Sequence, residues 1–377
     1  MNELRKQVFF ALTAGGAMNA KTLGEQCGLS AQVCLRTARQ LCALGLVREK
    51  TSTAANGKKQ VRFAAAKTQD CALGIHIEDD KVTLAVVAAD GSVKETSTLE
   101  RDADYTAVSA IEVLLERADR LINVPLRTVC AIGVTCPGPM RQQLGFLRPV
   151  TECGGFDLES FEQELNEAFE LPVVRGFDSA SAGEYFLATR KGAARGVTCC
   201  VDAGSLITAA TFVDGREIKG NGHAGLIAHM GVNFRDERCY CGNRGCLEGY
   251  ASTSLLRERL QKNTLFGIRL DTFDDTVKDY ASGDPATVKE VDTLCASLAM
   301  GLVNLVWTLE PSHLYLVGDL TRFPGALERT VHAVIKQRVL PESFAALSIE
   351  ISQNTLDEYA AGAALAAFGA SLAKRKK

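Results

Sequence analysis

The sequence predicts an α/β protein preceded by a small, basic, mainly helical domain. Strand-like and helix-like apolar segments alternate from Cys71 onward, which is typical of α/β architecture. The charge divides at the same place. Residues 1–66 hold ten Lys/Arg and three Asp/Glu, a net +7, so the remainder must carry −10 to reach the overall −3. At 377 residues the chain is long enough for two or three domains.

Composition is that of an ordinary globular protein, with 46% hydrophobic and 23% charged residues. The apolar runs are of strand length, so we expect no membrane-spanning segment. The first ten residues are charged at Glu3, Arg5 and Lys6 and lack a signal-peptide pattern. Thirteen cysteines form no regular framework, which argues against a disulfide scaffold. These features predict a protein of the reducing cytoplasm.

Three helices are predicted in the first 44 residues. Leu4–Ala14 has apolar residues at helical spacing. Asn19 can cap a second helix over Ala20–Cys27, and Gly28-Leu29 makes the turn that follows. Ser30 can cap a third helix that runs through Leu44. The predicted inward face of this third helix is Val33, Thr37, Leu41 and Leu44.

A β-hairpin is predicted after the third helix. Gly45 suits the left-handed position that ends a helix. Leu46–Lys50 and Lys59–Phe63 have strand character, and Asn56-Gly57 between them is a hairpin-turn signal. The order of three helices and a basic hairpin resembles a winged helix-turn-helix. A three-helix protein-interaction domain is the alternative.

The outward face of the third helix is suited to reading duplex DNA. Gln32, Leu35 and Arg39 are predicted to point outward, with Arg36 at the edge. Gln and Arg side chains can hydrogen-bond adenine and guanine edges, and a leucine can contact a thymine methyl. Cationic residues of the hairpin suit phosphate contacts. They are Arg48, Lys50, Lys58, Lys59 and Arg62.

The remainder of the chain is predicted to alternate between strands and helices, and shows no internal sequence repeat. Strands are predicted over Leu73–Ile77, Val82–Ala88, Val129–Val134, Cys199–Val201, Ile207–Val213 and Leu314–Val317. Helices are predicted over Ala107–Ile122, Leu158–Phe169, Ser181–Lys191, Val291–Leu309 and Ala360–Phe368.

Three cysteines form a compact cluster in the second half of the chain. Cys239, Cys241 and Cys246 lie within eight residues, with two glycines that let the backbone turn sharply. His229, ten residues upstream, would complete a Cys3His set, which is typical of a closed structural zinc site. Iron–sulfur ligation fits the spacing less well. A coincidental cluster in a cysteine-rich chain is the other alternative.

The same region carries a family resemblance. Gly220–His229 reads G-x-G-x-A-G-x-x-x-H, and residues 239–248 read C-x-C-G-x-x-G-C-x-E. Together they resemble the signature of the ROK family of sugar-responsive repressors and sugar kinases, with weaker echoes from about Leu73 onward. The resemblance implies an actin-like (ribonuclease H-like) fold with lobes at 71–187 and 188–377. It also implies zinc beside a sugar pocket. The last helix is predicted to pack on the N-terminal lobe.

Two loops that hold ATP phosphates in ROK kinases are altered in this chain. The family's D-x-G-G-T turn corresponds to residues 76–81, His-Ile-Glu-Asp-Asp-Lys, where the glycines are lost and Glu78, Asp79 and Asp80 are introduced. The glycine-rich second loop corresponds to Asp202–Ala209, where one glycine remains. Carboxylates and side chains in place of bare backbone oppose phosphate binding. The resemblance therefore implies a chain that is not an enzyme.

The sugar-binding residues of the family are partly kept. Asp178, His229 and Glu248 match, whereas Phe177 and Leu226 replace an amide and a carboxylate. The resemblance thus implies a sugar or sugar-phosphate effector held by the three matching residues. The residues themselves allow other roles. Asp178 could cap a helix, and Glu248 could orient the ligands of the cysteine cluster, which we call the knuckle.

Taken together, these features predict a non-catalytic DNA-binding transcriptional regulator of repressor type, which forms a homodimer or a higher homo-oligomer. Two alternatives remain open. In the first alternative the chain is a ROK-type sugar kinase with an appended N-terminal domain. In the second it is a DNA-binding protein whose ROK part only dimerises.

Overall fold

The structure is a computed structural model. It describes residues 2–53, 59–66, 70–79, 81–100, 128–143, 146–154, 156–233, 238–262, 272–323, 325–352 and 354–374. The predicted helix over Ala107–Ile122, the Asn56-Gly57 turn, the predicted DNA contact Lys58 and the loop residue Asp80 lie outside the described residues.

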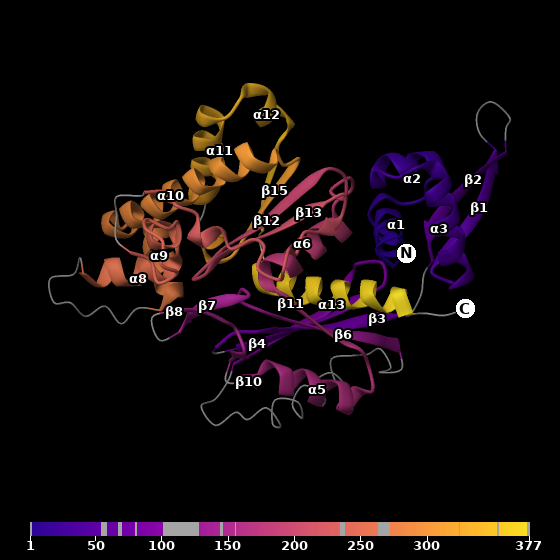
Figure 1. The fold of residues 1–377 in the computed structure, drawn as a ribbon, viewed down its shortest axis with the longest axis horizontal. Helices are drawn as coiled ribbons and strands as arrows, with labels where there is room; N and C mark the ends of the chain where they lie inside the picture. The colour runs from indigo at the N-terminus through magenta and orange to yellow at the C-terminus, as the bar shows by residue number, and fades with distance from the viewer. Residues whose placement is uncertain are drawn as a thin grey trace.

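The N-terminal domain consists of three helices and an antiparallel hairpin (Figure 1). Asn19 caps the second helix by accepting a hydrogen bond from the Thr22 amide, and Ser30 caps the third through the Val33 amide. Gly28 ends the second helix with φ 64°, a conformation that favours glycine. The elements are α1 (Asn2–Gly15), α2 (Ala20–Cys27), α3 (Ala31–Ala43), β1 (Val47–Thr53) and β2 (Lys59–Ala65).

The buried face of α3 differs from the predicted one. Val33 and Leu44 are only half-buried, and the buried residues are Cys34, Thr37, Ala38 and Leu41. The small side chains of Cys34 and Ala38 face the core, so the helix is rotated by about half a residue, roughly 50°, from the predicted orientation. As a result Leu35 is half-buried against this core, and Arg36 is exposed rather than at the edge.

Two five-stranded sheets form the body of the protein. The first has the order β11-β6-β3-β4-β5 and the second β14-β13-β12-β15-β16. In each sheet an antiparallel hairpin (β3-β4 or β12-β13) is followed by two parallel strands on one side and one antiparallel strand on the other. The two sheets therefore share one topology, a structural duplication that the sequence does not reveal. The strands are β3 (Cys71–Ile77), β4 (Lys81–Ala88), β5 (Val93–Glu100), β6 (Val129–Cys136), β11 (Val173–Phe177), β12 (Val197–Ala203), β13 (Ile207–Val213), β14 (Arg216–Glu217), β15 (His313–Val317) and β16 (Ser348–Ile351).

Helices cover the two sheets and define two lobes. We call the first sheet with α5 and α13 the first lobe, and the second sheet with α6 to α12 the second lobe. α6, which the predicted boundary at residue 187 assigns to the first lobe, packs on the second sheet, where Phe186 stacks on Tyr315 at 4.5 Å between ring centroids. The helices are α5 (Leu158–Phe169), α6 (Asp178–Thr189), η2 (Ile227–His229), α7 (Glu248–Ala251), α8 (Thr253–Lys262), α9 (Phe273–Ser282), α10 (Pro285–Leu309), η3 (Asp319–Arg322), α11 (Ala326–Arg338), α12 (Pro341–Ala346) and α13 (Thr355–Lys374). Two small hairpins complete the first lobe, β7 (Met140–Gln143) with β8 (Phe146–Pro149) and β9 (Glu152–Cys153) with β10 (Phe156–Asp157).

The last helix lies against the first sheet at very close range. A Cβ at Gly74 or Gly133 would overlap a backbone carbonyl oxygen of α13. A Cβ at Gly362 of α13 would in turn overlap the Ser181 carbonyl of α6. Three glycines therefore allow β3, β6, α6 and α13 to pack backbone to backbone, and Figure 1 shows α13 passing between the two sheets.

α10 is long and apolar enough to cross a membrane, by length and composition alone. Among the described residues it is the one helix that meets this test, with a mean hydropathy of 1.4 in its most apolar window. More than half of that window, 56%, is buried inside the protein. Its buried residues belong to the core of the second lobe, as expected of a core helix.

Candidate functional sites

The cysteine knuckle brings four predicted ligands together. The ligand atoms of His229, Cys239, Cys241 and Cys246 all lie within 4.8 Å of one another. Cys241 Sγ lies 3.6 Å from Cys246 Sγ, and Cys239 Sγ lies 3.6 Å from His229 Nδ1. A zinc tetrahedron with bonds of about 2.3 Å separates its sulfurs by about 3.7 Å. The four side chains could therefore hold a metal ion without rearrangement of the backbone.

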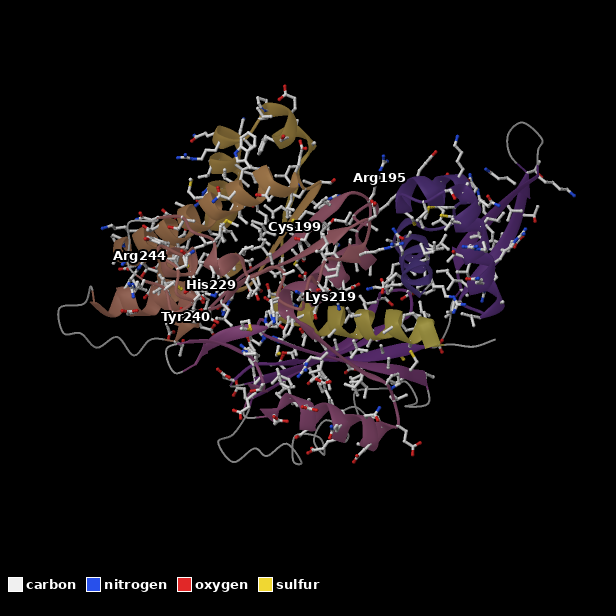
Figure 2. The ribbon with its side chains drawn as sticks, viewed as in Figure 1. Arg195, Cys199, Lys219, His229, Tyr240 and Arg244 are labelled. Atoms are coloured by element: carbon white, nitrogen blue, oxygen red, sulfur yellow. The ribbon has the colours of Figure 1, made fainter. Side chains whose placement is uncertain are left out.

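Glycines and short backbone bridges position these ligands. Gly242 and Gly245 have φ values of 94° and 59°, and a Cβ at Gly245 would overlap the Asn233 carbonyl. A bridge between Gly231 and Cys246 ties the knuckle to the segment that follows His229. The side chains of His229 and Tyr240 lie together at this end of the second lobe (Figure 2).

Glu248 contacts two residues of the knuckle, Tyr240 and His229. It accepts a hydrogen bond from the Tyr240 hydroxyl, and its Oε2 lies 4.0 Å from His229 Nδ1. The Tyr240 ring meets the His229 ring edge-on at 5.3 Å between centroids. Burial, followed by the hydrogen bond to Glu248, raises the pKa of Tyr240 well above its usual range. Glu248 therefore orients the ring that packs on the predicted ligand His229.

A cleft of about 450 Å³ lies between the two lobes. It is lined from the β3-β4 turn by Glu78 and Lys81, from the β12-β13 turn by Asp202 and Leu206, and from the start of α6 by Asp178. The second lobe adds Asp319 and Arg322 of η3, and α13 adds Thr355 and Tyr359. The cleft is large enough for a small ligand, since ligand pockets begin at roughly 300 Å³.

The carboxylate of Asp178 is held by two buried partners. His76 Nε2 lies 3.0 Å from its Oδ2, and Thr135 Oγ1 donates to its Oδ1 at 2.9 Å. Ser181 donates in turn to Thr135 at 2.9 Å. Asp178 is the first residue of α6 and makes no capping hydrogen bond, so the interpretation as a helix cap is wrong.

Three further acidic side chains face the cleft. Burial, and then the nearby charge of Asp178, raises the pKa of Asp202 well above its usual value. Burial likewise raises the pKa of Asp319 and of Glu78, and Glu78 forms an ion pair with Lys81 at 3.0 Å. With Asp178, the lining of the cleft therefore has four acidic side chains and two basic ones, Lys81 and Arg322.

The three predicted sugar contacts are not gathered in one cavity. Asp178 lines the cleft, whereas Glu248 lines a separate groove beside the knuckle. Phe177 borders a third cavity of about 110 Å³, next to Gly222 and Gly225. Leu226, in place of the family's carboxylate, precedes the short helix η2 that carries His229.

The cationic side chains of the N-terminal domain are exposed on one helix and the hairpin. Gln32, Arg36 and Arg39 are exposed on α3, and Arg48 and Lys59 are exposed on the hairpin. Arg39 forms a loose ion pair with Glu49 of β1 at 3.7 Å. Leu35 lies in the surface hollow between these residues, although it is half-buried.

Several cleft residues had no role in the sequence prediction. Asp319 and Tyr359 line the cleft, and His76 is a buried partner of Asp178, so only the folded chain brings these residues together. One signal was present for His76, since by the family resemblance it would stand at the aspartate position of the first phosphate loop.

The sequence is similar to those of two bacterial transcriptional regulators. The chain is 23% identical to the xylose repressor of Bacillus spizizenii over 76% of this chain and 74% of that protein. It is also 23% identical to the DNA-binding transcriptional dual regulator NagC of Escherichia coli, over 86% of this chain and 82% of that protein.

Solved structures agree in fold. A ROK family transcriptional regulator described as a homologue of the E. coli MLC protein matches with a TM-score of 0.69 at 19% identity, over 97% of each chain. The ROK hexokinase of Thermus thermophilus matches with a TM-score of 0.61 at 22% identity, over 79% of this chain and 98% of that one. Residues 72–369 match the sequence profile of the ROK family. With its two lobes of α/β structure and its cysteine knuckle, this chain belongs to the ROK family.

Proposed function

We propose that the protein is a DNA-binding transcriptional regulator of repressor type, with a winged helix-turn-helix as its reading domain and a non-catalytic, ligand-responsive body. The observation that carries this proposal is the exposed face of α3 with its basic hairpin. The helix presents Gln32, Arg36 and Arg39 to solvent on a domain of net charge +7. Such a face provides base contacts and phosphate contacts together.

The hairpin itself favours an anionic partner. Lys50 lies directly opposite Arg62 across the two strands, and both side chains are exposed. Like charges at directly opposed positions destabilise a hairpin. A phosphate backbone between them would relieve this repulsion, so the pair supports DNA rather than protein as the partner of the domain.

The relatives support the same function. The NagC match covers 86% of this chain, whereas the family profile over residues 72–369 covers 298 of 377 residues, or 79%, so this similarity extends beyond the family body. Two reading domains on a two-fold body would recognise a pseudo-palindromic operator, and we propose a homodimer on this ground.

The cleft supports a sensor rather than a kinase. Both carboxylate oxygens of Asp178 are already bonded, by His76 and Thr135. Each oxygen keeps a second lone pair that can accept a hydrogen bond from a sugar hydroxyl, so these bonds fix the carboxylate as a contact for a ligand. The lining of the cleft also has more acidic side chains than basic ones, which disfavours ATP phosphates. We therefore propose that the cleft binds a sugar, with Asp178 as a contact, and that its acidic lining favours a neutral sugar over a phosphorylated one.

The knuckle is proposed to hold one structural zinc ion through His229, Cys239, Cys241 and Cys246. Three thiolates and one imidazole are a typical closed zinc set, and zinc there would supply cross-linking rather than chemistry. Glu248 is proposed to orient the knuckle through Tyr240 rather than to touch the sugar in the cleft. None of the thirteen cysteines forms a disulfide, which supports a reducing cytoplasm as the site of action.

Selection from random duplexes with the full-length protein tests the proposal. We expect enrichment of a pseudo-palindrome, and a shift in thermal stability with one or more members of a panel of free sugars. Enrichment without any sugar response would leave the alternative in which the ROK part only dimerises. If no duplex is enriched, the proposed function is wrong.

A further inference from the structure

α1 of the N-terminal domain makes polar contacts with the second lobe. Lys6 forms an ion pair with Glu184 of α6, and the two side chains are only 14% and 8% exposed. Gln7 donates from Nε2 to the carbonyl of Asp214, in the β13-β14 turn, at 2.5 Å, and to the carbonyl of Cys27 at 2.7 Å. Gln7 thereby joins the end of α2 to the second sheet.

The same helix also packs on the first lobe. The ring of Phe9 lies 5.6 Å from that of Phe368 in α13, and Arg5 donates to the carbonyl of Leu372 at 3.2 Å. A Cβ at Gly369 would come within 2.8 Å of the Lys6 side chain, so this glycine leaves room for the lysine stem. Figure 1 shows α1 beside the C-terminal part of α13.

The two helices that α1 contacts are those through which the lobes meet. α6 is fixed to the second sheet through Gly183 and Phe186, and α13 is fixed to the first sheet through Gly74 and Gly133. α6 also meets the first lobe, through the Ser181–Thr135 hydrogen bond and the close contact with Gly362, so a change in the angle between the lobes would act at the α6–α13 crossing. Each helix begins at the cleft, α6 with Asp178 and α13 with Thr355.

We propose that α1 is a strap across the α6–α13 crossing, which converts the angle between the lobes into the position of the DNA-reading domain. The proposal rests on the DNA-binding function proposed above. A rigid helix cannot keep both the Lys6–Glu184 pair and the Phe9–Phe368 contact when α6 moves relative to α13. The domain therefore follows one lobe, and the distance between two reading domains on a dimer changes with it.

A first experiment tests whether the Lys6–Glu184 pair holds α1 against α6, by hydrogen–deuterium exchange of the full-length protein. Lys6→Met leaves the buried Glu184 carboxylate unpaired, so we expect exchange of residues 2–15 to rise about tenfold through local opening. Lys6→Met with Glu184→Leu replaces the ion pair by an apolar pair and should restore slow exchange. Arg175→Met, which removes the Arg175–Glu162 ion pair of the first lobe, is the matched control and should leave residues 2–15 unchanged.

A second experiment tests the link to the cleft. Leu206→Trp places a bulky side chain in the β12-β13 turn that lines the cleft, and should alter exchange both in residues 2–15 and in α6. Val93→Trp, on the exposed strand β5, is the control of equal size. If Leu206→Trp changes exchange around the cleft but leaves residues 2–15 as in the wild type, the strap is refuted. The exchange readout needs no DNA, so a protein that binds no duplex would refute the proposed function and still test the strap.

Discussion

His76 Nε2 lies 3.0 Å from Asp178 Oδ2, and both side chains are almost completely buried. This pair joins the end of β3 to the first residue of α6. Burial by itself lowers the pKa of His76, but the charge of Asp178 and the hydrogen bond to it outweigh burial and raise this pKa above its usual value near 6.5. The pair thus replaces a free carboxylate by an internal ion pair.

The pH dependence of stability should report this pair. Because the pKa of His76 is raised in the folded state, its stabilising effect is complete below about pH 6.5 and is lost as pH rises through the folded-state pKa. His76→Gln should lower the free energy of unfolding by about 2 kcal/mol at pH 6 and by less at higher pH. The other groups facing His76 are Glu78, Lys81 and Tyr359. Urea unfolding of both proteins between pH 6 and 9 measures the difference, and a constant difference would contradict the assignment.

Measurement of the metal content tests whether the knuckle binds zinc. Protein purified without added metal should contain one zinc per chain, and Cys246→Ser should lose it. We expect the variant to unfold at lower temperature, because binding energy at a structural zinc site is folding energy. Cys42→Ser, a half-buried thiol of the N-terminal domain, is the control and should keep the metal. Wild-type protein that is metal-free and fully folded would overturn this prediction.

Two cations of the N-terminal domain should behave differently on DNA. Arg39→Ala should cost about 1–3 kcal/mol of binding free energy and relax the sequence preference if Arg39 reads a base edge. Lys59→Ala should weaken binding to every duplex and reduce the salt slope by about one. Fluorescence anisotropy across a salt series measures both, with the exposed Lys278→Ala of α9 as control. Equal effects of the two variants on all sequences would contradict the division of roles.

Kinase activity should be absent. We base this expectation on the family resemblance, by which Glu78, Asp79, Leu206 and Ile207 would stand where kinase loops have bare backbone. The zinc-loaded protein with ATP, magnesium and a panel of hexoses should form no sugar phosphate. Robust turnover would favour the kinase with an appended domain.

The close packing of α13 predicts a strong steric effect at one strand glycine. Gly133→Ala would place a methyl group against the Ala363 carbonyl, and such overpacking costs about 1–3 kcal/mol or more. Gly249→Ala has no atom within 4 Å of the added methyl and should be nearly neutral. Chemical denaturation of the two variants measures the contrast, and a neutral Gly133→Ala would show that the helix can shift.

Much of the fold could be predicted from local signals. Asn19, Ser30 and Gly45 define the ends of helices in the N-terminal domain, and the structure has each of them in the predicted role. β5 was missed because Val93–Glu100 is mainly polar and exposed, as an edge strand can be. The duplicated topology was also missed, since strand order depends on contacts between distant segments.

The candidate sites were predictable to different degrees. His229, Cys239, Cys241 and Cys246 are close in sequence, so their spacing alone predicted the cluster that the structure has. The cleft is assembled from six separate segments, and no periodicity links His76 to Asp178 or Asp202 to Tyr359. Asp178 and Glu248 were expected together through the family resemblance, yet they line different cavities.

Phe9 and Leu12 of the reading domain share one hydrophobic core with Ala364, Phe368 and Leu372 of the body. A domain joined in this way does not move independently of the body. The side of α13 that it covers would be exposed apolar surface in a relative without the domain. The side chains of α1 and of the last turns of α13 therefore have to fit one another. Exchanging reading domains between relatives should succeed only when the matching end of the chain is exchanged with them.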